Sequence, residues 1–176
     1  ITGDGSLKVS SSAYGIVVKS GTGNASLTIN NASVKANTTS TSSYFAGVYV
    51  MSSSNATDSP ELSLAVNGGS LTASGGTSSD GIQFYVGDPN ATNAITSLTV
   101  SGNAIVDART GGIKATRVST ILPTPTPTGG NSSGIVFDGT EGTVYGNVTL
   151  DESLTIGEDE TLTIPEGSKL CLLYTS

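Results

Sequence analysis

The strongest constraint on this 176-residue chain is an internal repeat. Three consecutive copies align, each with a Ser-Leu segment, a second short segment, and a third that opens with Gly-Val or Gly-Ile. The recurring anchors are Leu27, Leu64 and Leu98 in the first segment and Gly47, Gly81 and Gly112 in the third. A period of about 35 residues that varies between copies is typical of solenoids, whose loops differ in length.

Within each copy the apolar residues stand at every second position, as in Ser26-Leu27-Thr28-Ile29. This is the strand period, and clusters of Gly, Asn and Ser between the segments mark turns. A single coil of three short strands cannot bury its inward face, but coils stacked about 4.8 Å apart share one continuous core. The sequence therefore predicts an all-β fold, a parallel β-helix (solenoid) with three short strands per coil.

The composition agrees with this fold class. Charged residues are only 12% of the chain, and Ser, Thr, Asn and 23 Gly take their place. Ser and Asn side chains compete with helix formation by bonding to nearby backbone, and Thr favours strands. The bias therefore favours many short strands joined by turns over helices.

Partial copies of the repeat flank the three complete ones, at residues 7–9, 15–18 and 134–137, so at least four coils are expected. Nearer the C-terminus the rhythm shortens to segments at 147–150, 153–156 and 161–164. We expect these shorter repeats, within 147–167, to continue the helix with tight corners. A separate hairpin module is the alternative. Residues 1–170 are assigned to one β-helix fragment.

Proline occupies alternate positions at 123, 125 and 127, within a Pro/Thr-rich segment at 120–130. Proline cannot donate a ladder hydrogen bond and favours an extended, solvated chain. The segment is therefore predicted to be a loop that projects from one coil. A spacer between two domains is the alternative.

Both ends of the sequence carry expectations about its origin. Residue 1 opens directly on patterned sequence without a signal peptide, so an earlier N-terminal part is expected. Residues 171–176 resemble the translation of a transposase adapter used in sequencing libraries. We expect the chain to be a metagenomic fragment with a non-native tail, which would leave the natural segment without Cys or His.

The net charge of −7 disfavours nucleic acid as a partner, because phosphate binding needs clustered Lys and Arg and the chain has 7 in all. A run of about 18 apolar residues, the minimum for a membrane span, does not occur in the sequence. We expect no cofactor and no metal.

If Leu, Val and Ala point inward, the outward side chains form columns across the coils. One predicted column holds Lys35, Thr72 and Asp107, and another holds Tyr49, Gln83, Lys114 and Val136. Neither column supplies the pair of acids that sugar-cleaving enzymes use.

The best charged cluster in the sequence is Asp107, Arg109 and Lys114, with Arg117 nearby, and it could hold an acidic sugar. The alternative is a solvated group of surface ion pairs, since such pairs are common and contribute little.

The most specific binding hypothesis concerns aromatic residues. Tyr49 and Tyr85 are predicted to face outward on the third strands of adjacent coils, beside Gln83, as a platform on which a sugar ring could stack. The alternative is that the two rings pair across the strands for stability.

The Gly-Ile-x-x anchors, the Ser97-Leu98-Thr99-Val100 strand and the Leu-Thr-Ile-Pro-Glu-Gly ending at 162–167 resemble the β-helical repeat regions of large surface proteins of gut Firmicutes. The resemblance covers roughly residues 1–170 and implies a right-handed parallel β-helix in an extracellular stalk or adhesin-like protein. It brings no catalytic residues with it.

We therefore expect a non-catalytic structural or adhesive segment of an extracellular bacterial surface protein. A carbohydrate-binding β-helix module is the first alternative, and a polysaccharide lyase-like enzyme is a more distant one. The expected partners are glycans, a host or cell-wall surface, and neighbouring β-helix coils of the parent chain.

Overall fold

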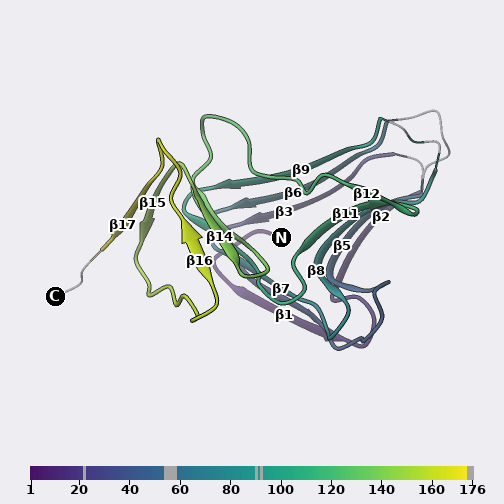
Figure 1. Cartoon of the computed structure of the whole chain (residues 1–176), viewed down its shortest axis with the longest axis horizontal. Coiled ribbons are helices and arrows are strands. Elements are labelled where there is room, and N and C mark those ends of the chain that lie inside the picture. The colour runs from purple at the N-terminus through teal and green to yellow at the C-terminus, as the bar shows by residue number, and fades with distance from the viewer. Residues whose placement is uncertain (22, 54–58, 90, 92, 174–176) are drawn as a thin grey trace.

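The computed structural model describes residues 1–21, 23–53, 59–89, 91 and 93–173. Every regular element in this part of the chain is a strand, so it contains no helix that could cross a membrane. Three sheets of mostly parallel strands enclose a triangular core, and the C-terminal strands lie beside it at the left of Figure 1.

The first sheet contains β3 (Ala25–Asn30), β6 (Glu61–Asn67) and β9 (Ile95–Ser101). The second contains β1 (Ser6–Ser11), β4 (Ser33–Thr38), β7 (Ser70–Ser74), β10 (Ala104–Ala108), β13 (Gly134–Asp138), β14 (Glu141–Tyr145) and β16 (Thr161–Thr163). The third contains β2 (Ile16–Ser20), β5 (Ala46–Ser52), β8 (Asp80–Val86), β11 (Ile113–Arg117) and β12 (Thr120–Leu122). A separate pair is formed by β15 (Asn147–Leu150) and β17 (Lys169–Leu172).

The chain visits the three sheets in turn, so β3, β4 and β5 form one coil, β6, β7 and β8 the next, and β9, β10 and β11 the third. Each strand pairs in parallel with its counterpart one coil later. The predicted all-β class and the three short strands per coil are confirmed, and the stacked parallel strands fit the expected parallel β-helix.

The core consists of the alternate residues that the strand period assigned to the inside. Leu27, Leu64 and Leu98 stack in register in the first sheet and are between 1% and 8% exposed. Phe84 in the third sheet is fully buried and belongs to the same cluster, which extends through all three coils. Each coil therefore completes the core of its neighbours.

Amide and hydroxyl side chains connect the coils at the corner between the first and second sheets. Asn67 Nδ2 donates to Asn30 Oδ1 at 2.9 Å, and Ser101 Oγ donates to Asn67 Oδ1 at 2.9 Å. Asn30 Nδ2 in turn donates to Thr2 Oγ1 at 3.2 Å. Such ladders satisfy polar groups at the coil corners and fix the register from one coil to the next.

The Pro/Thr-rich segment does not project from the stack. Pro125 and Pro127 are buried, and Thr124 and Thr126 between and beside them are exposed, which is the alternation of a strand. Residues 122–126 line one cavity together with residues 94–97 at the start of β9, and the segment runs beside β9 in Figure 1. The prolines thus occupy the place of a further first-sheet strand, although they cannot pair with β9 as a strand would.

This placement explains why one predicted column is wrong. Val136 was expected beside Lys114 in the third sheet, but β13 belongs to the second sheet and Val136 pairs with Val106. Because the Pro/Thr segment already occupies the first position of the fourth coil, the next strand takes the second position.

Beyond β13 the chain reverses direction. The strand β14 pairs antiparallel with β13, and β16 and β17 then pair in parallel with β14 and β15. The prediction that the shorter repeats continue the stack is therefore wrong in direction, and residues 153–156 form no strand. Cys171 and Leu172, assigned to a non-native tail, lie in β17, whereas residues 174–176 fall outside the described residues.

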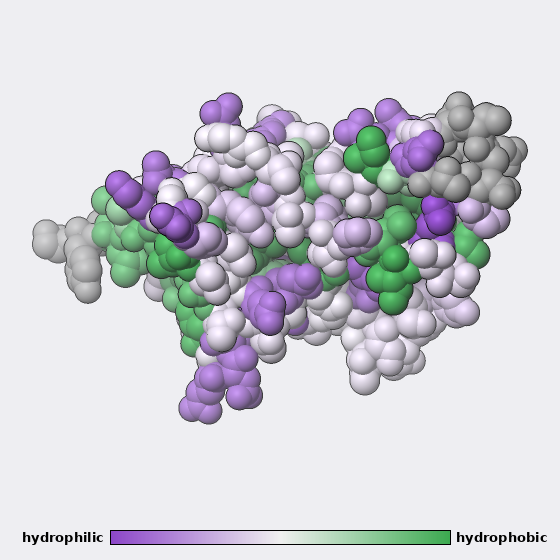
Figure 2. Space-filling model, turned by 45° about the horizontal axis from the view of Figure 1, so that its top comes forward, coloured by the Kyte–Doolittle hydropathy of each residue, from purple (hydrophilic) through white to green (hydrophobic). Residues whose placement is uncertain are grey.

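The C-terminal region has its own small core of buried Ile135, Phe137, Val144, Val148 and Leu150. It also exposes large apolar side chains, with Ile164 50% and Leu172 61% exposed. Figure 2 shows apolar green atoms gathered at this end, whereas much of the stack surface in that view carries the pale colours of Ser, Thr and Gly.

Candidate functional site

The outer face of the third sheet carries two adjacent rows of side chains. Strand register and the alternation of side chains place Val17, Tyr49, Gln83 and Lys114 in one row. The neighbouring row holds Lys19, Met51, Tyr85 and Thr116. The predicted alignment of Tyr49, Gln83 and Lys114 is thus observed.

The tyrosines of this face stack on one another along the coils. The ring of Tyr49 lies 4.6 Å from that of Tyr14 and 6.0 Å from that of Tyr85, centroid to centroid, and Phe45 meets Tyr14 edge-on at 4.9 Å. Tyr49 is only 6% exposed. Burial is the largest cause that raises the pKa of its hydroxyl, and the neighbouring Tyr14 raises it further. Tyr49 therefore serves the aromatic stack, and the predicted platform of two open rings is not formed.

Tyr85 has a different environment, because the stack stops at it. Its neighbour in register on the next coil is Thr116, a side chain too short to cover an aromatic ring. Tyr85 is half-buried, with Tyr49 on one side. Thr116 therefore leaves open space over the Tyr85 ring on the side of the next coil.

A groove of about 240 Å³ lies over this part of the sheet. Its lining combines four tyrosines, three further hydrogen-bonding side chains, one cation and one valine. The residues are Tyr14, Ser43, Tyr44, Tyr49, Gln83, Tyr85, Lys114, Thr116 and Val118. Tyr44, on the loop before β5, is 79% exposed and stands at the rim. We call this space the Gln83 groove.

Two oxygen atoms in the Gln83 groove lack a hydrogen-bond partner among the described residues. They are Oε1 of Gln83, a residue that is 5% exposed, and Oγ1 of Thr116, a residue that is 7% exposed. Buried polar atoms are nearly always paired, and leaving one unpaired costs about 1–3 kcal/mol. The sequence offered no signal for Thr116, because only the register brings it beside Tyr85.

The cation at the edge of the groove is already in contact with an acid. Lys114 Nζ lies 3.9 Å from Asp80 Oδ2. Burial raises the pKa of the Asp80 carboxyl, and the positive charge of Lys114 partly opposes that rise. The groove is therefore lined by a lysine whose charge is already weakly paired, with an acid that lines a neighbouring hollow.

The predicted charged cluster is divided between two faces of the molecule. Arg109 Nη1 donates to Asp107 Oδ2 at 2.9 Å, its Nε lies 3.1 Å from Glu160 Oε2, and its guanidinium stacks 3.6 Å from the centre of the Phe137 ring. Lys114 pairs with Asp80 on the third sheet instead. Asp107 and Lys114 therefore belong to different sheets and cannot form one acidic-sugar site.

Arg117, the fourth member of that cluster, is also engaged elsewhere. Its Nη1 donates to the Ala91 carbonyl at 3.0 Å. The cluster failed as a prediction because nearness in sequence does not place residues on the same side of a coil, where each corner turns the chain to a new face.

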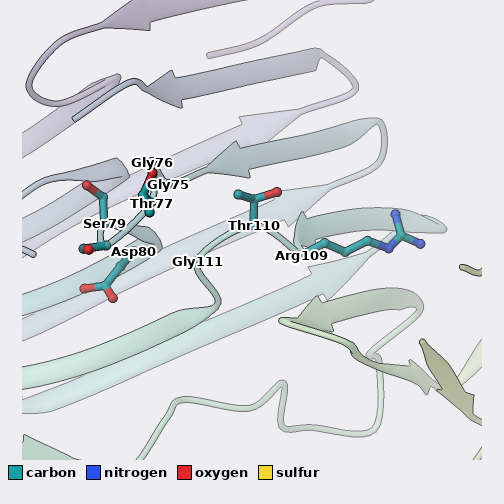
Figure 3. A pocket seen from close by; sticks show the side chains of 9 residues that line it. Gly75, Gly76, Thr77, Ser79, Asp80, Arg109, Thr110 and Gly111 are labelled. Atoms are coloured by element: carbon teal, nitrogen blue, oxygen red, sulfur yellow. The ribbon is translucent and has the colours of Figure 1, made fainter. Parts of the chain in front are cut away.

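A second hollow, of about 720 Å³, lies at the corner between the second and third sheets. Its walls are Gly-rich turns at residues 75–80 and 109–111. Figure 3 shows Asp80 at one end of it and the Arg109 side chain extending away from it. Because this hollow is wide and its charged groups diverge, the Gln83 groove is the better candidate for recognition.

Comparison with known proteins adds no assignment, because no family model, no curated protein and no solved structure matches this chain. Among the described residues, three or more His, Cys, Asp or Glu side chains do not gather as a metal site would require. The stack and its surface are therefore the features that bear on function.

Proposed function

We propose that this chain is a non-catalytic structural or adhesive segment of an extracellular bacterial surface protein. The observation that carries this proposal is the continuity of the stack, in which successive coils share one core and are joined in register in all three sheets. A rod of this kind can be lengthened coil by coil without a change of fold, which is what a surface stalk needs.

The ion pairs support the same proposal, because the two shortest of them, both made by Arg109, join parts of the fold. Arg109 joins Asp107 on β10 to Glu160 in the C-terminal region, and it also donates to the Thr155 carbonyl at 3.0 Å. An acid that cleaves glycosidic bonds needs a second carboxyl at about 5–10 Å and access to substrate. Asp107 instead lies against a guanidinium that is itself stacked on Phe137.

The mechanical part of the proposal is tested by pulling the chain from both ends in a single-molecule force experiment. We expect discrete unfolding steps, in which the C-terminal region opens separately and the coils of the stack, which share one core, then unfold together. Smooth extension without discrete steps would contradict a load-bearing rod.

The non-catalytic part is tested by incubating the protein with neutral and acidic polysaccharides. The expected result is no new reducing ends and no unsaturated uronide absorbance. Release of either product by the protein, abolished in Asp107→Asn, would overturn the proposal in favour of a polysaccharide-cleaving enzyme.

A further inference from the structure

We propose that the Gln83 groove is a binding site for one neutral, hydroxyl-rich sugar ring of a glycan. The site goes beyond a structural role for the stack, and it rests on the two unpaired oxygens of Gln83 and Thr116 beside the ring of Tyr85. It gives the rod a specific point of contact.

The hydrogen-bonding chemistry of the groove selects hydroxyl groups. The Oε1 atom of Gln83 can only accept, so its missing partner must be a donor. The Thr116 hydroxyl can both donate and accept. A ligand that presents adjacent hydroxyls, each able to donate and accept, satisfies both atoms at once.

The dimensions of the groove match a single ring. Gln83 and Lys114 are neighbours in one row, and Tyr85 and Thr116 are neighbours in the next, so these four side chains stand at the corners of a rectangle. Strand spacing and the alternation of side chains make this rectangle about 5 Å by 7 Å. The volume of 240 Å³ lies below the range of about 300–1,000 Å³ that accommodates drug-sized ligands.

The apolar side of the groove supplies the other half of sugar recognition. Tyr85 lines it next to Thr116, and Tyr44 projects at the rim with most of its surface in solvent. Aromatic rings with a polar tip provide large apolar contact at small entropic cost. A pyranose has an apolar C–H face and a hydroxyl edge, so it can contact the tyrosines. It reaches the two oxygens, each less than 1 Å² exposed, when the Gln83 and Thr116 side chains rotate toward the groove.

The charges of the groove favour a neutral sugar over an acidic one. Lys114 is the cation that lines the groove, and Asp80 lies 3.9 Å from its ammonium. A carboxylate ligand would have to compete with Asp80 and approach a chain of net charge −7. Arg109, which could have added positive charge, belongs to the other face.

The test compares wild-type protein with Gln83→Leu and Thr116→Val, which remove the unpaired oxygens while keeping the side chains similar in size. Binding is measured by NMR titration with oligosaccharides of neutral hexoses and, separately, of uronic acids. We expect wild type to bind at least one neutral oligosaccharide with millimolar or better affinity, and each variant to lose at least tenfold. Thr72→Val, on the outer face of the second sheet, is the matched control and should bind as wild type does.

Thermal unfolding of the same variants separates lost recognition from lost structure. Removing an unpaired buried oxygen should leave the melting temperature of Gln83→Leu and Thr116→Val unchanged or raised. Three results would overturn the site: no binding of any neutral oligosaccharide by wild type, undiminished binding by both variants, or binding of uronic acids alone. The force experiment is independent of all three, so the structural proposal stands or falls separately.

Discussion

The stack formed by residues 6–117 and the region formed by residues 134–172 use similar sequence segments in different ways. In the stack, the third segment of each copy enters the third sheet and pairs in parallel with the preceding coil. In the C-terminal region, the Gly-Ile segment at 134–137 enters the second sheet and then pairs antiparallel with β14. A Gly-Ile segment therefore determines a strand, but its place on the stack determines its partners and the face that meets the main core. Ile82 and Phe84 lie in that core, whereas in the later segment Val136 does and Ile135 and Phe137 lie in the C-terminal core.

The two regions also differ in how they are held. The stack is held by a core that extends through its coils, whereas the C-terminal region has a core of its own, and Arg109 contacts it from the end of β10. We infer that the stack unfolds as one unit, and that the C-terminal region can open while the stack stays folded.

The largest expected effects come from truncating one buried phenylalanine in each region. Phe84 and Phe137 are both fully buried, and either substitution by Ala should lower the free energy of unfolding of its own region by about 3–5 kcal/mol. Hydrogen exchange should show lost protection across β3 to β11 for Phe84→Ala, but only in β13 to β17 for Phe137→Ala. Equal loss across the stack in both variants would show that the two regions form one cooperative unit.

A smaller loss of stability is expected when either of two glycines is replaced by alanine. A Cβ at Gly47 would lie 2.6 Å from the Ala36 carbonyl oxygen and 2.8 Å from the Ser74 nitrogen, both backbone atoms, so Gly47→Ala should cost about 1–3 kcal/mol or more.

Gly139, in the turn between β13 and β14, meets no atom within 4 Å but has a φ of +59°. Gly139→Ala should therefore cost only about 1 kcal/mol through backbone strain. Urea denaturation measures both costs. A larger loss for Gly139→Ala than for Gly47→Ala would contradict the close packing between coils at Gly47.

Removing the Arg109 side chain, which connects the two regions, should lower the free energy of unfolding by a smaller amount than truncating either phenylalanine. Arg109→Gln loses the contacts to Glu160 and Phe137, which together are expected to contribute about 1–2 kcal/mol. Hydrogen exchange should increase in residues 151–163 and stay unchanged in β3, β6 and β9. Lys114→Gln, which loses one contact of 3.9 Å, is the control and should leave residues 151–163 as they are.

The smallest expected effect concerns pH. Because burial raises the pKa of Asp80, the folded chain retains a proton that the unfolded chain loses first. Stability should therefore fall as the pH rises from the ordinary value of this carboxyl toward its raised folded value. Asp80→Asn should remove this part of the pH dependence in melting curves recorded from about pH 3 upward. An unchanged profile in the variant would show that Asp80 ionises alike in both states.

Much of the candidate site could be read from the sequence, because it depends on register. The alignment of Tyr49, Gln83 and Lys114 followed from counting residues from the glycine anchors and applying the strand period. Thr116 and Tyr14 could not be found in this way, since neither side chain carries a binding signal by itself. The grouping of Arg109 with Lys114 was wrong because a corner separates them.

The sequence alone determined the strand period, the repeat and the inward residues of its three complete copies, since these depend on local alternation and on the burial of apolar side chains. The tertiary structure decided the position of the prolines beside β9, the reversal at β14 and the isolation of the Gln83 and Thr116 oxygens. Those outcomes depend on which surfaces remain uncovered once the coils have stacked, and residues distant in sequence set that condition.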